Sequence, residues 1–235
     1  MDGDEHVRDW AALHLTEPPA GLVGGWLRAA AAVARPLARA GISPNTVTVA
    51  ALVTAGAAVP LAAVDGWAGP AAACAAVTLS GLLDSLDGAV AVQAGRTTRV
   101  GFLLDSALDR LADAALPAAL AVAAGGGATP TRLAVGATAA CWWLEYVRAR
   151  ASLAGVSDQG RQIVTPGERP TRIILTAVGL GLPVLALAAL WAHVVIVGAS
   201  GLFLFVHSIR QLRHLDQQHL DQQHPDRPPA PTAGS

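Results

Sequence analysis

Lysine is absent from this sequence of 235 residues, so all 16 of its basic residues are arginine. Aromatic residues amount to only 4%, which leaves alanine, valine and leucine to supply most of the apolar mass. The two cysteines, Cys74 and Cys141, lie in apolar segments, where we expect small buried hydrophobic side chains. The amino terminus, MDGDEHVRDW, is acidic and polar, and we therefore expect no secretory signal there.

Charge is also missing from four long stretches of the chain. Residues 45–64, 68–83, 114–131 and 173–209 contain no Asp, Glu, Lys or Arg. With 53% hydrophobic residues and a mean hydropathy of +0.45, these runs favour a membrane domain over a soluble core, because a spanning helix needs about 20 mostly apolar residues. The sequence predicts an all-α polytopic membrane protein with six transmembrane helices, at about 45–64, 68–92, 100–124, 132–151, 171–189 and 191–210.

The arginines are distributed unevenly around these predicted spans. If both termini are cytoplasmic, nearly every arginine falls on the cytoplasmic side, and only Arg132, at the start of the fourth span, is on the outer side. Cytoplasmic loops of membrane proteins carry an excess of basic residues. We therefore expect a multi-pass protein with both termini in the cytoplasm.

The segment before the first span predicts a helix of a different kind. Arg28, Arg35 and Arg39 are spaced by seven and four residues, so they share one face of a helix whose other positions are mostly apolar. This pattern indicates an amphipathic helix lying along the cytoplasmic membrane interface. A basic linker is the alternative, and residues 1–18 form an extension before it.

The carboxyl-terminal segment, residues 211–235, has a repetitive composition. The pentapeptide HLDQQ occurs twice in succession and is followed by a proline-rich end. We expect a disordered, low-complexity tail here, and the histidines five residues apart do not predict a metal site. The membrane domain would then comprise residues 19–210.

Four aspartates interrupt the second and third predicted spans. Asp84 and Asp87 are three residues apart near the cytoplasmic end of one, and Asp105 and Asp109 are four apart near the start of the other. Such pairs share a helix face, and the short connection predicts antiparallel neighbours, so the four carboxylates can converge. A carboxylate at bilayer depth costs about 2.5–3.5 kcal/mol on insertion scales, and a bound divalent cation compensates this cost. Oxygen ligands suit Mg²⁺, Mn²⁺ or Ca²⁺, and four of them can hold two ions.

Two glycines accompany these aspartates. Gly88 directly follows Asp87, and Gly101 lies on the facing helix, where each leaves room for a ligand to approach the backbone. Two metal ions about 3.5–4 Å apart can clamp a phosphoryl group during its transfer. Alternatively, the carboxylates cap helix ends, line a proton or cation pathway, or pair with Arg96, Arg99 and Arg110.

In this segment the chain resembles the CDP-alcohol phosphatidyltransferase family, whose motif is D-x2-D-G-x2-A-R-x8-G-x3-D-x3-D. The matching residues, all at the family spacing, are Asp84, Asp87, Gly88, Ala91, Gly101, Asp105 and Asp109. The resemblance covers about residues 20–210 and implies an enzyme of phospholipid biosynthesis in the bacterial inner (plasma) membrane, with a cytoplasmic active site. The arginine of the motif is replaced by Val92, which leaves open a catalytically weak relative that binds CDP-lipid.

The resemblance also implies a reaction and the residues that perform it. The hydroxyl of an acceptor alcohol attacks CDP-diacylglycerol, and CMP leaves. Asp84, Asp87, Asp105 and Asp109 would hold Mg²⁺ or Mn²⁺, as two ions, and Asp109 would also be the catalytic base. Asn45, Thr48, Gly88, Thr98 and Gly101 would contact CDP-lipid, although Asn45 and Thr48 can also simply cap a helix. A homodimer in membrane lipid is expected, and no nucleic-acid partner.

Four arginines suggest which acceptor is used. Guanidinium groups bind phosphate through two parallel hydrogen bonds, so their convergence at the inner face would favour an acceptor that itself bears a phosphate. These residues are Arg148, Arg150, Arg169 and Arg172. Their pattern is similar to that of actinobacterial phosphatidylinositol phosphate synthases and implies inositol phosphate as the acceptor.

Other readings of the same features stay open. Glycerol 3-phosphate, the acceptor of phosphatidylglycerophosphate synthases, also bears a phosphate. The arginines can reflect the charge bias of cytoplasmic loops and nothing more. A transporter or cation-binding membrane protein is an alternative from another class, but we see no inverted repeat in the sequence to support it.

Overall fold

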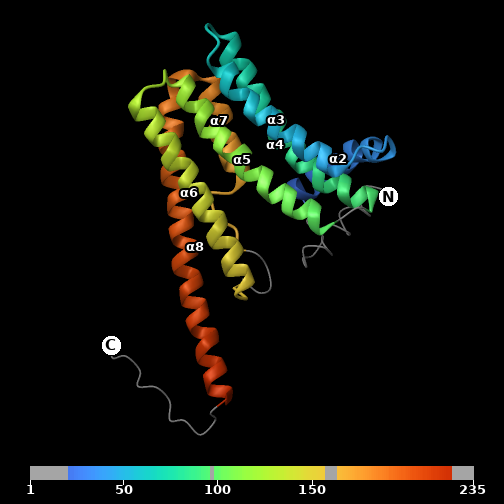
Figure 1. The fold of residues 1–235 in the computed structure, drawn as a ribbon, viewed down its shortest axis with the longest axis vertical. Coiled ribbons are helices and arrows are strands. Elements are labelled where there is room, and N and C mark those ends of the chain that lie inside the picture. Colours follow the sequence, from blue (N-terminus) through green and yellow to red (C-terminus); the bar gives the residue numbers. More distant parts are fainter. Residues whose placement is uncertain (1–20, 96–97, 157–162, 224–235) are drawn as a thin grey trace.

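The computed structural model describes residues 21–95, 98–156 and 163–223, and no strand occurs among them (Figure 1). The described chain is therefore all-helical, as predicted. Its elements, in order, are α2 (Gly21–Arg39), α3 (Pro44–Ala62), α4 (Ala68–Ala94), α5 (Arg99–Ala123), α6 (Ala128–Leu153), α7 (Arg169–Gly181), the short 3-10 helix η1 (Pro183–Leu185) and α8 (Ala186–Gln223).

Local sequence signals fix the helix ends that matter for the aspartates. Ser43 caps α3, because its hydroxyl accepts a hydrogen bond from the Thr46 amide at 3.2 Å. Gly95 ends α4 in the left-handed conformation, with φ of 59°, which glycine adopts without steric cost. Thr98 begins α5 by accepting a hydrogen bond from the Gly101 amide at 3.0 Å. The turn between α4 and α5 is thus set by its own residues.

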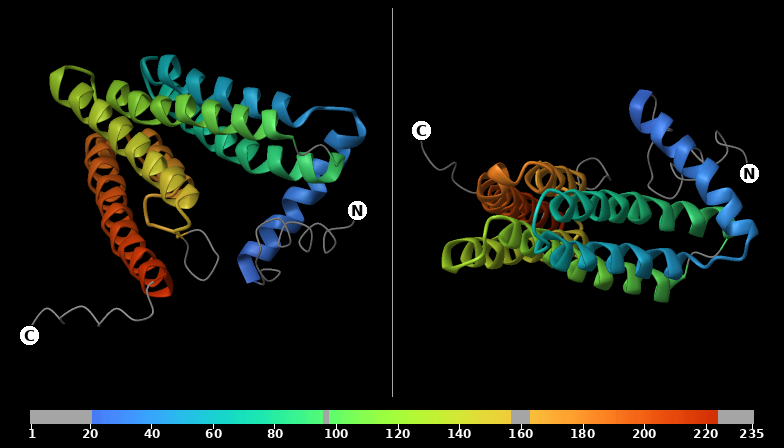
Figure 2. Two further views of the ribbon diagram at one scale, coloured as in Figure 1. Left: turned by 60° about the horizontal axis from the view of Figure 1, so that its bottom comes forward. Right: turned by 90° about the horizontal axis from the view of Figure 1, so that it is seen from above.

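The helices pack as two groups that share a common core. α3 packs against both α4 and α5, while α6 packs mainly against α8, and α7 contacts α4, α5 and α8 (Figure 2). The largest cluster of buried apolar side chains joins α3, α4, α5, α6, α7 and α8, and it includes Val77, Leu116, Leu120, Leu180 and Leu190. This core holds α7 between the two groups.

Helix α2 crosses the end of the α3–α5 group at a steep angle and packs against α4 (Figure 2). Its buried residues Ala30 and Ala34 pack against Ala89 and Val90 of α4, while Arg28 and Arg39 are exposed. The helix therefore packs on α4 through small apolar residues, and its amphipathic character stays a prediction. Its position along a membrane interface stays a prediction.

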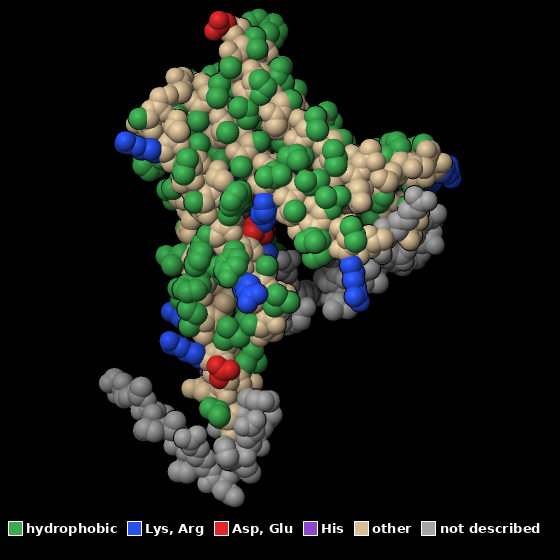
Figure 3. All heavy atoms as spheres, in the orientation of Figure 1, with side chains coloured by type: hydrophobic (Ala, Val, Ile, Leu, Met, Phe, Trp, Pro, Cys, Tyr) green, Lys and Arg blue, Asp and Glu red, His purple; other side chains and the backbone are tan. Residues whose placement is uncertain are grey.

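Three helices of the described chain are long and apolar enough to cross a membrane. They are α3, α4 and the continuous segment from Pro183 to Gln218, which contains η1 and most of α8. Hydrophobic side chains spread over much of the molecular face drawn in Figure 3. The chain is therefore a membrane protein, and the predicted number of six spans goes beyond these three helices.

The predicted boundary between the last two spans, near residue 190, is wrong. α7 ends at Gly181, and α8 already begins at Ala186. The break falls at Leu182, whose extended backbone (φ −128°, ψ 84°) precedes Pro183, because proline disfavours helix in the residue before it. As a result α7 has only 13 residues, or about 20 Å of helix at 1.5 Å per residue.

The predicted disordered tail is also corrected in part. Residues 211–223 continue α8 as regular helix. The repeat contains leucine, glutamine, aspartate and histidine but neither glycine nor proline, so nothing in it interrupts a helix that is already formed. The described helix reaches Gln223, and residues 224–235 lie outside the described part of the chain.

One glycine of α7 provides a test of this packing. A β-carbon on Gly179 would lie 2.9 Å from the Ala189 β-carbon and 2.5 Å from a Leu120 methyl group. We predict that Gly179→Ala lowers the free energy of unfolding by about 1–3 kcal/mol, because the helices would have to move apart. The measurement is thermal unfolding of the purified protein in detergent micelles.

The matched control is Gly198→Ala in α8, where an added β-carbon meets no atom within 4 Å. Removing a glycine from the interior of a helix is expected to gain about 0.5–1 kcal/mol. An equal loss of stability in both variants would contradict the close packing of α7 against α5 and α8.

Candidate active site

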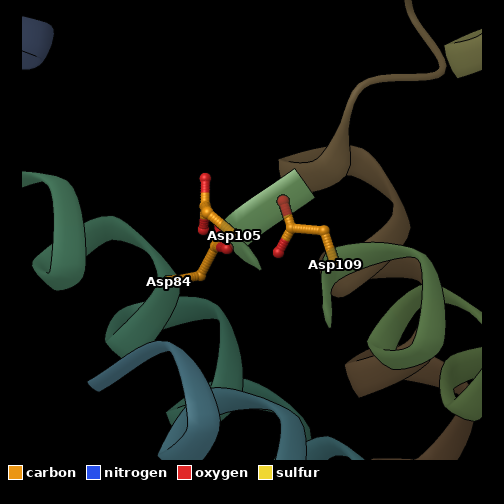
Figure 4. Close-up of side chains that lie close together, drawn as sticks. All are labelled: Asp84, Asp105 and Asp109. Carbon is orange, nitrogen blue, oxygen red and sulfur yellow. The ribbon is translucent and has the colours of Figure 1, made fainter. Parts of the chain in front are cut away.

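Three aspartates from two helices point toward one another. Asp84 on α4 and Asp105 and Asp109 on α5 each offer one carboxylate oxygen, and these oxygens all lie within 4.8 Å of one another (Figure 4). Asp105 and Asp109 are one helical turn apart and therefore share a face of α5. α3 packs against both α4 and α5, whereas α4 and α5 make few direct contacts with each other. The space between α4 and α5 is therefore available to the carboxylates.

The fourth motif aspartate, Asp87, lies beside this group and not within it. Its side chain is buried, and its Oδ1 accepts a hydrogen bond from the Gly88 amide at 2.6 Å. Its Oδ2 is also buried but has no hydrogen-bond partner among the described residues. Asp87 is close enough to Asp105 for the two negative charges to repel each other. A buried carboxylate oxygen without a partner is costly, so this position favours a bound cation.

Arg169, the first residue of α7, is the cation that the structure places at the aspartates. One of its guanidinium nitrogens, Nη1, lies 3.2 Å from Asp84 Oδ1 and also forms an ion pair with Asp109 Oδ1. Its side chain is only 13% exposed. Arg169 thus bridges α4 and α5 and balances part of their negative charge.

A second charged cluster lies one turn farther along α5. Asp113, whose side chain is fully buried, accepts from Arg172 at 2.8 Å and pairs with Arg110 at 3.2 Å. Arg172 also donates to Glu145 of α6 at 3.0 Å and contacts the Cys141 thiol. These contacts tie α5, α6 and α7 together, and each buried charge has an opposite partner, as buried charges require.

Arg148 fixes the chain that leads into α7. It donates to the Ile163 carbonyl at 2.7 Å and to Glu168 Oε1 at 2.6 Å. The same Glu168 oxygen accepts from the Thr165 amide and hydroxyl, at 2.8 and 3.0 Å. Glu168, the residue just before Arg169, is therefore held by a charged hydrogen-bond network. This network fixes the position of the backbone where α7 begins.

The four predicted phosphate-binding arginines thus occupy different environments. Arg148 and Arg172 are buried and paired with carboxylates, Arg169 pairs with the aspartates of the candidate site, and Arg150 is exposed near the end of α6. The structure brings Arg169 to the aspartates and leaves Arg150 on the surface. A common phosphate site for all four stays a prediction.

The predicted CDP-lipid residues lie at the start of α3, on α4 and at the start of α5. Near Gly101, an added β-carbon would approach Thr98 Oγ1 at 3.1 Å and Asn45 Oδ1 at 3.4 Å, so these three residues come together. Thr48 is buried, and its hydroxyl lies beside the Asp87 carboxylate. A β-carbon on Gly88 would meet no atom within 4 Å, so the backbone there is open to a ligand. Arg96, one of the arginines considered as partners of the carboxylates, lies outside the described residues.

This set of donors fits a hard divalent cation. Carboxylate oxygens are the ligands that Mg²⁺ and Mn²⁺ prefer, and the group of three is joined by the unpartnered Oδ2 of Asp87 close by. A cation at the centre would touch aspartates from both helices. The site can therefore hold a divalent metal ion.

Comparison with known proteins agrees with this geometry. The family model of the CDP-alcohol phosphatidyltransferases matches residues 41–206, which contain every motif position described above. The chain belongs to the CDP-alcohol phosphatidyltransferase family. The resemblance inferred from the motif is thus confirmed, and with it a place among the transferases of this family.

Individual relatives narrow the comparison. The chain is 36% identical to the archaetidylinositol phosphate synthase of Aeropyrum pernix over 63% of its own length and 72% of that protein. It is also 36% identical to the phosphatidylinositol phosphate synthase of Mycolicibacterium smegmatis, over 64% of this chain and 66% of the relative. The chain thus spans just under two thirds of that mycobacterial protein.

Solved structures show the same fold. The phosphatidylinositol phosphate synthase of Mycobacterium tuberculosis in complex with manganese and citrate matches with a TM-score of 0.62 at 26% identity, over 76% of this chain and 88% of the other. A second crystal structure of that enzyme, with CDP-diacylglycerol bound, gives a TM-score of 0.61 at 25% identity, over 76% of this chain and 92% of the other.

Sequence reasoning missed the second charged cluster. The pairs Arg110–Asp113 and Glu145–Arg148 have the three-residue spacing of helical ion pairs, which would have been a usable signal. The pairing of Arg172 with Asp113, 59 residues away, and of Arg148 with Glu168, 20 residues away, depends on how the helices pack.

We predict that Asp113→Ala destabilises the protein severely, by about 3–5 kcal/mol, because it leaves Arg172 buried without its closest carboxylate. Thermal unfolding in detergent measures this loss. Asp65→Ala, at an exposed position between α3 and α4, is the control and is expected to unfold at the wild-type temperature. Similar unfolding temperatures for Asp113→Ala and wild type would refute the structural role of Asp113.

Proposed function

We propose that this protein transfers a phosphatidyl group from CDP-diacylglycerol to a phosphorylated acceptor alcohol, with inositol phosphate as the acceptor and CMP as the leaving group. The observation that carries the proposal is the convergence of Asp84, Asp105 and Asp109 at motif positions of the family. Relatives named as inositol phosphate lipid synthases support the choice of acceptor.

We place the reaction at the cytoplasmic side of the bacterial plasma membrane. α5 and α6 would cross the bilayer in addition to the three apolar segments. α7, with 13 residues, would be a short sixth span that requires local thinning of the bilayer. Six spans return both termini to the cytoplasm. The arginine distribution supports this orientation. The acyl chains of the donor would then stay in lipid while the nucleotide remains in water. A homodimer is the assembly that we expect.

Within this site, Asp84, Asp87, Asp105 and Asp109 are the proposed ligands of two Mg²⁺ or Mn²⁺ ions. Bound ions of this kind neutralise the pyrophosphate and the charge that develops on the leaving CMP. Asp109 accepts the proton of the acceptor hydroxyl, whose oxygen forms the new bond to the β-phosphorus as the bond to CMP breaks. Asn45, Thr48, Gly88, Thr98 and Gly101 would hold the CDP group.

Two features leave alternatives within the same family. Glycerol 3-phosphate carries the same phosphate as inositol phosphate, so the arginines do not separate the two acceptors. Val92 replaces the motif arginine in α4, which favours weak binding of the CDP group and leaves room for a relative that binds CDP-lipid without turning it over. Both alternatives predict a different outcome in an acceptor panel.

The first experiment supplies the full-length protein in detergent with CDP-diacylglycerol, Mg²⁺ or Mn²⁺, and one acceptor at a time. We expect CMP release with inositol phosphate and little with glycerol 3-phosphate, inositol or glycerol. Release with glycerol 3-phosphate alone would assign the protein as a phosphatidylglycerophosphate synthase. No CMP with any acceptor, combined with measurable binding of CDP-diacylglycerol, would favour the binding protein.

A substitution tests the role of the base. We predict that Asp109→Asn lowers kcat by a factor of about 10²–10⁴, because the amide cannot accept the proton of the hydroxyl. Binding of CDP-diacylglycerol should change much less than turnover, and Asp65→Asn, far from the aspartates in sequence and exposed, should leave kcat unchanged. Turnover close to wild type in Asp109→Asn would exclude Asp109 as the base.

A further inference from the structure

Arg169 and a metal ion would compete for the same carboxylates. The guanidinium of Arg169 pairs with Asp84 Oδ1 and Asp109 Oδ1, and these residues provide two of the three converging carboxylates. A divalent cation draws its affinity from direct contact with such oxygens. The positive charge of Arg169 at these two carboxylates therefore opposes the binding of a cation there.

The neighbouring arginines, Arg148 and Arg172, pair with carboxylates outside the group of three aspartates. Arg172 is held by Asp113 and Glu145, and Arg148 is held by Glu168 and the Ile163 carbonyl. These contacts also anchor both sides of Arg169 in the chain, at Glu168 and at Arg172. The backbone at Arg169 is therefore fixed by its neighbours, and the long side chain is the part that can move.

The guanidinium of Arg169 has a hydrogen-bond donor that the aspartates do not use. Its Nε is buried and has no partner among the described residues, so the aspartates do not satisfy the whole group. Arginine can bind a phosphate through two parallel N–H groups, and Nε–H together with one Nη–H forms one such pair. A side chain released from the aspartates would be able to bind an acceptor phosphate with both.

We propose that Arg169 is an exchangeable counter-ion: without metal it neutralises Asp84 and Asp109, and when a divalent cation takes those oxygens its side chain turns to the phosphate of the acceptor. The inference rests on the proposed function for the identity of the acceptor. Under this exchange the metal binds before the acceptor, because the acceptor site is complete only after the metal has released Arg169. By linkage, the acceptor raises the affinity for metal by the same factor that metal raises the affinity for acceptor.

The first test measures metal binding without any turnover. Free Mn²⁺ is followed by electron paramagnetic resonance during titration of the full-length protein in detergent, in the absence of substrates. We expect Arg169→Gln to bind Mn²⁺ about tenfold more tightly than wild type, in the range usual for coupled sites. Arg169→Lys keeps a cation and should stay closer to wild type.

The matched control for charge is Arg99→Gln, which removes a guanidinium from an exposed position at the start of the same helix that carries Asp105 and Asp109. We expect its Mn²⁺ affinity to equal that of wild type. An unchanged or weaker affinity in Arg169→Gln would overturn the exchange. So would an equal gain in Arg99→Gln, because the effect would then come from net charge and not from the ion pairs.

The second test measures the coupling with inositol phosphate and, separately, glycerol 3-phosphate as probes. In the wild type, Mn²⁺ should increase the affinity for the phosphorylated probe about 5- to 150-fold, and the coupling should disappear in Arg169→Gln. Coupling that persists in Arg169→Gln would mean that metal and phosphate touch directly, which overturns the exchange.

These outcomes are separate from those of the enzyme assay. Tighter Mn²⁺ binding by Arg169→Gln, together with absence of CMP release by the wild type, would support the counter-ion and reject the proposed reaction. CMP release by the wild type, together with unchanged Mn²⁺ binding by Arg169→Gln, would support the proposed reaction and reject the counter-ion.

Discussion

Negative charge gathered between α4 and α5 must be balanced by a cation, and the rest of the site is arranged around this requirement. Asp84, Asp105 and Asp109 point toward one another, and Asp87 has a buried oxygen without a partner. Carboxylates removed from water are costly unless they are paired. Arg169 meets part of this need, and the oxygens are suited to a divalent metal for the remainder.

The other arginines form a scaffold for this arrangement. Arg172 and Arg148 join α5, α6 and the chain before α7 through carboxylates, so they hold the first turn of α7 against the aspartates. A buried arginine whose guanidinium pairs with carboxylates of the fold stabilises a position, and most of its charge is already balanced there. The arginines that sequence analysis assigned to one phosphate site thus differ in their surroundings: Arg148 and Arg172 pair with carboxylates that hold the fold together, whereas Arg169 pairs with the aspartates of the candidate site.

The family motif made the aspartates predictable because its spacing is a property of helices. Residues three and four apart share a face, and the residues of the turn itself, Gly95 and Thr98, set where α4 ends and α5 begins. Predictions from local sequence were wrong at the boundary between the last two spans and in the tail. Pro183 broke the last apolar run eight residues earlier than expected, and the polar repeat after Arg210 continued as helix because nothing in it stops one.

The sequence by itself determined the helical class, the membrane character, the family and the positions of the motif aspartates, since each depends on composition or on spacing within one helix. Only the tertiary structure decided which charges meet. The partners Asp113 with Arg172 and Asp84 with Arg169 are brought together by α7 packing against α4 and α5, over sequence separations that no local pattern encodes. Whether an arginine binds a ligand or supports the fold depends on those long-range contacts, because the side chain is the same and only its partners differ.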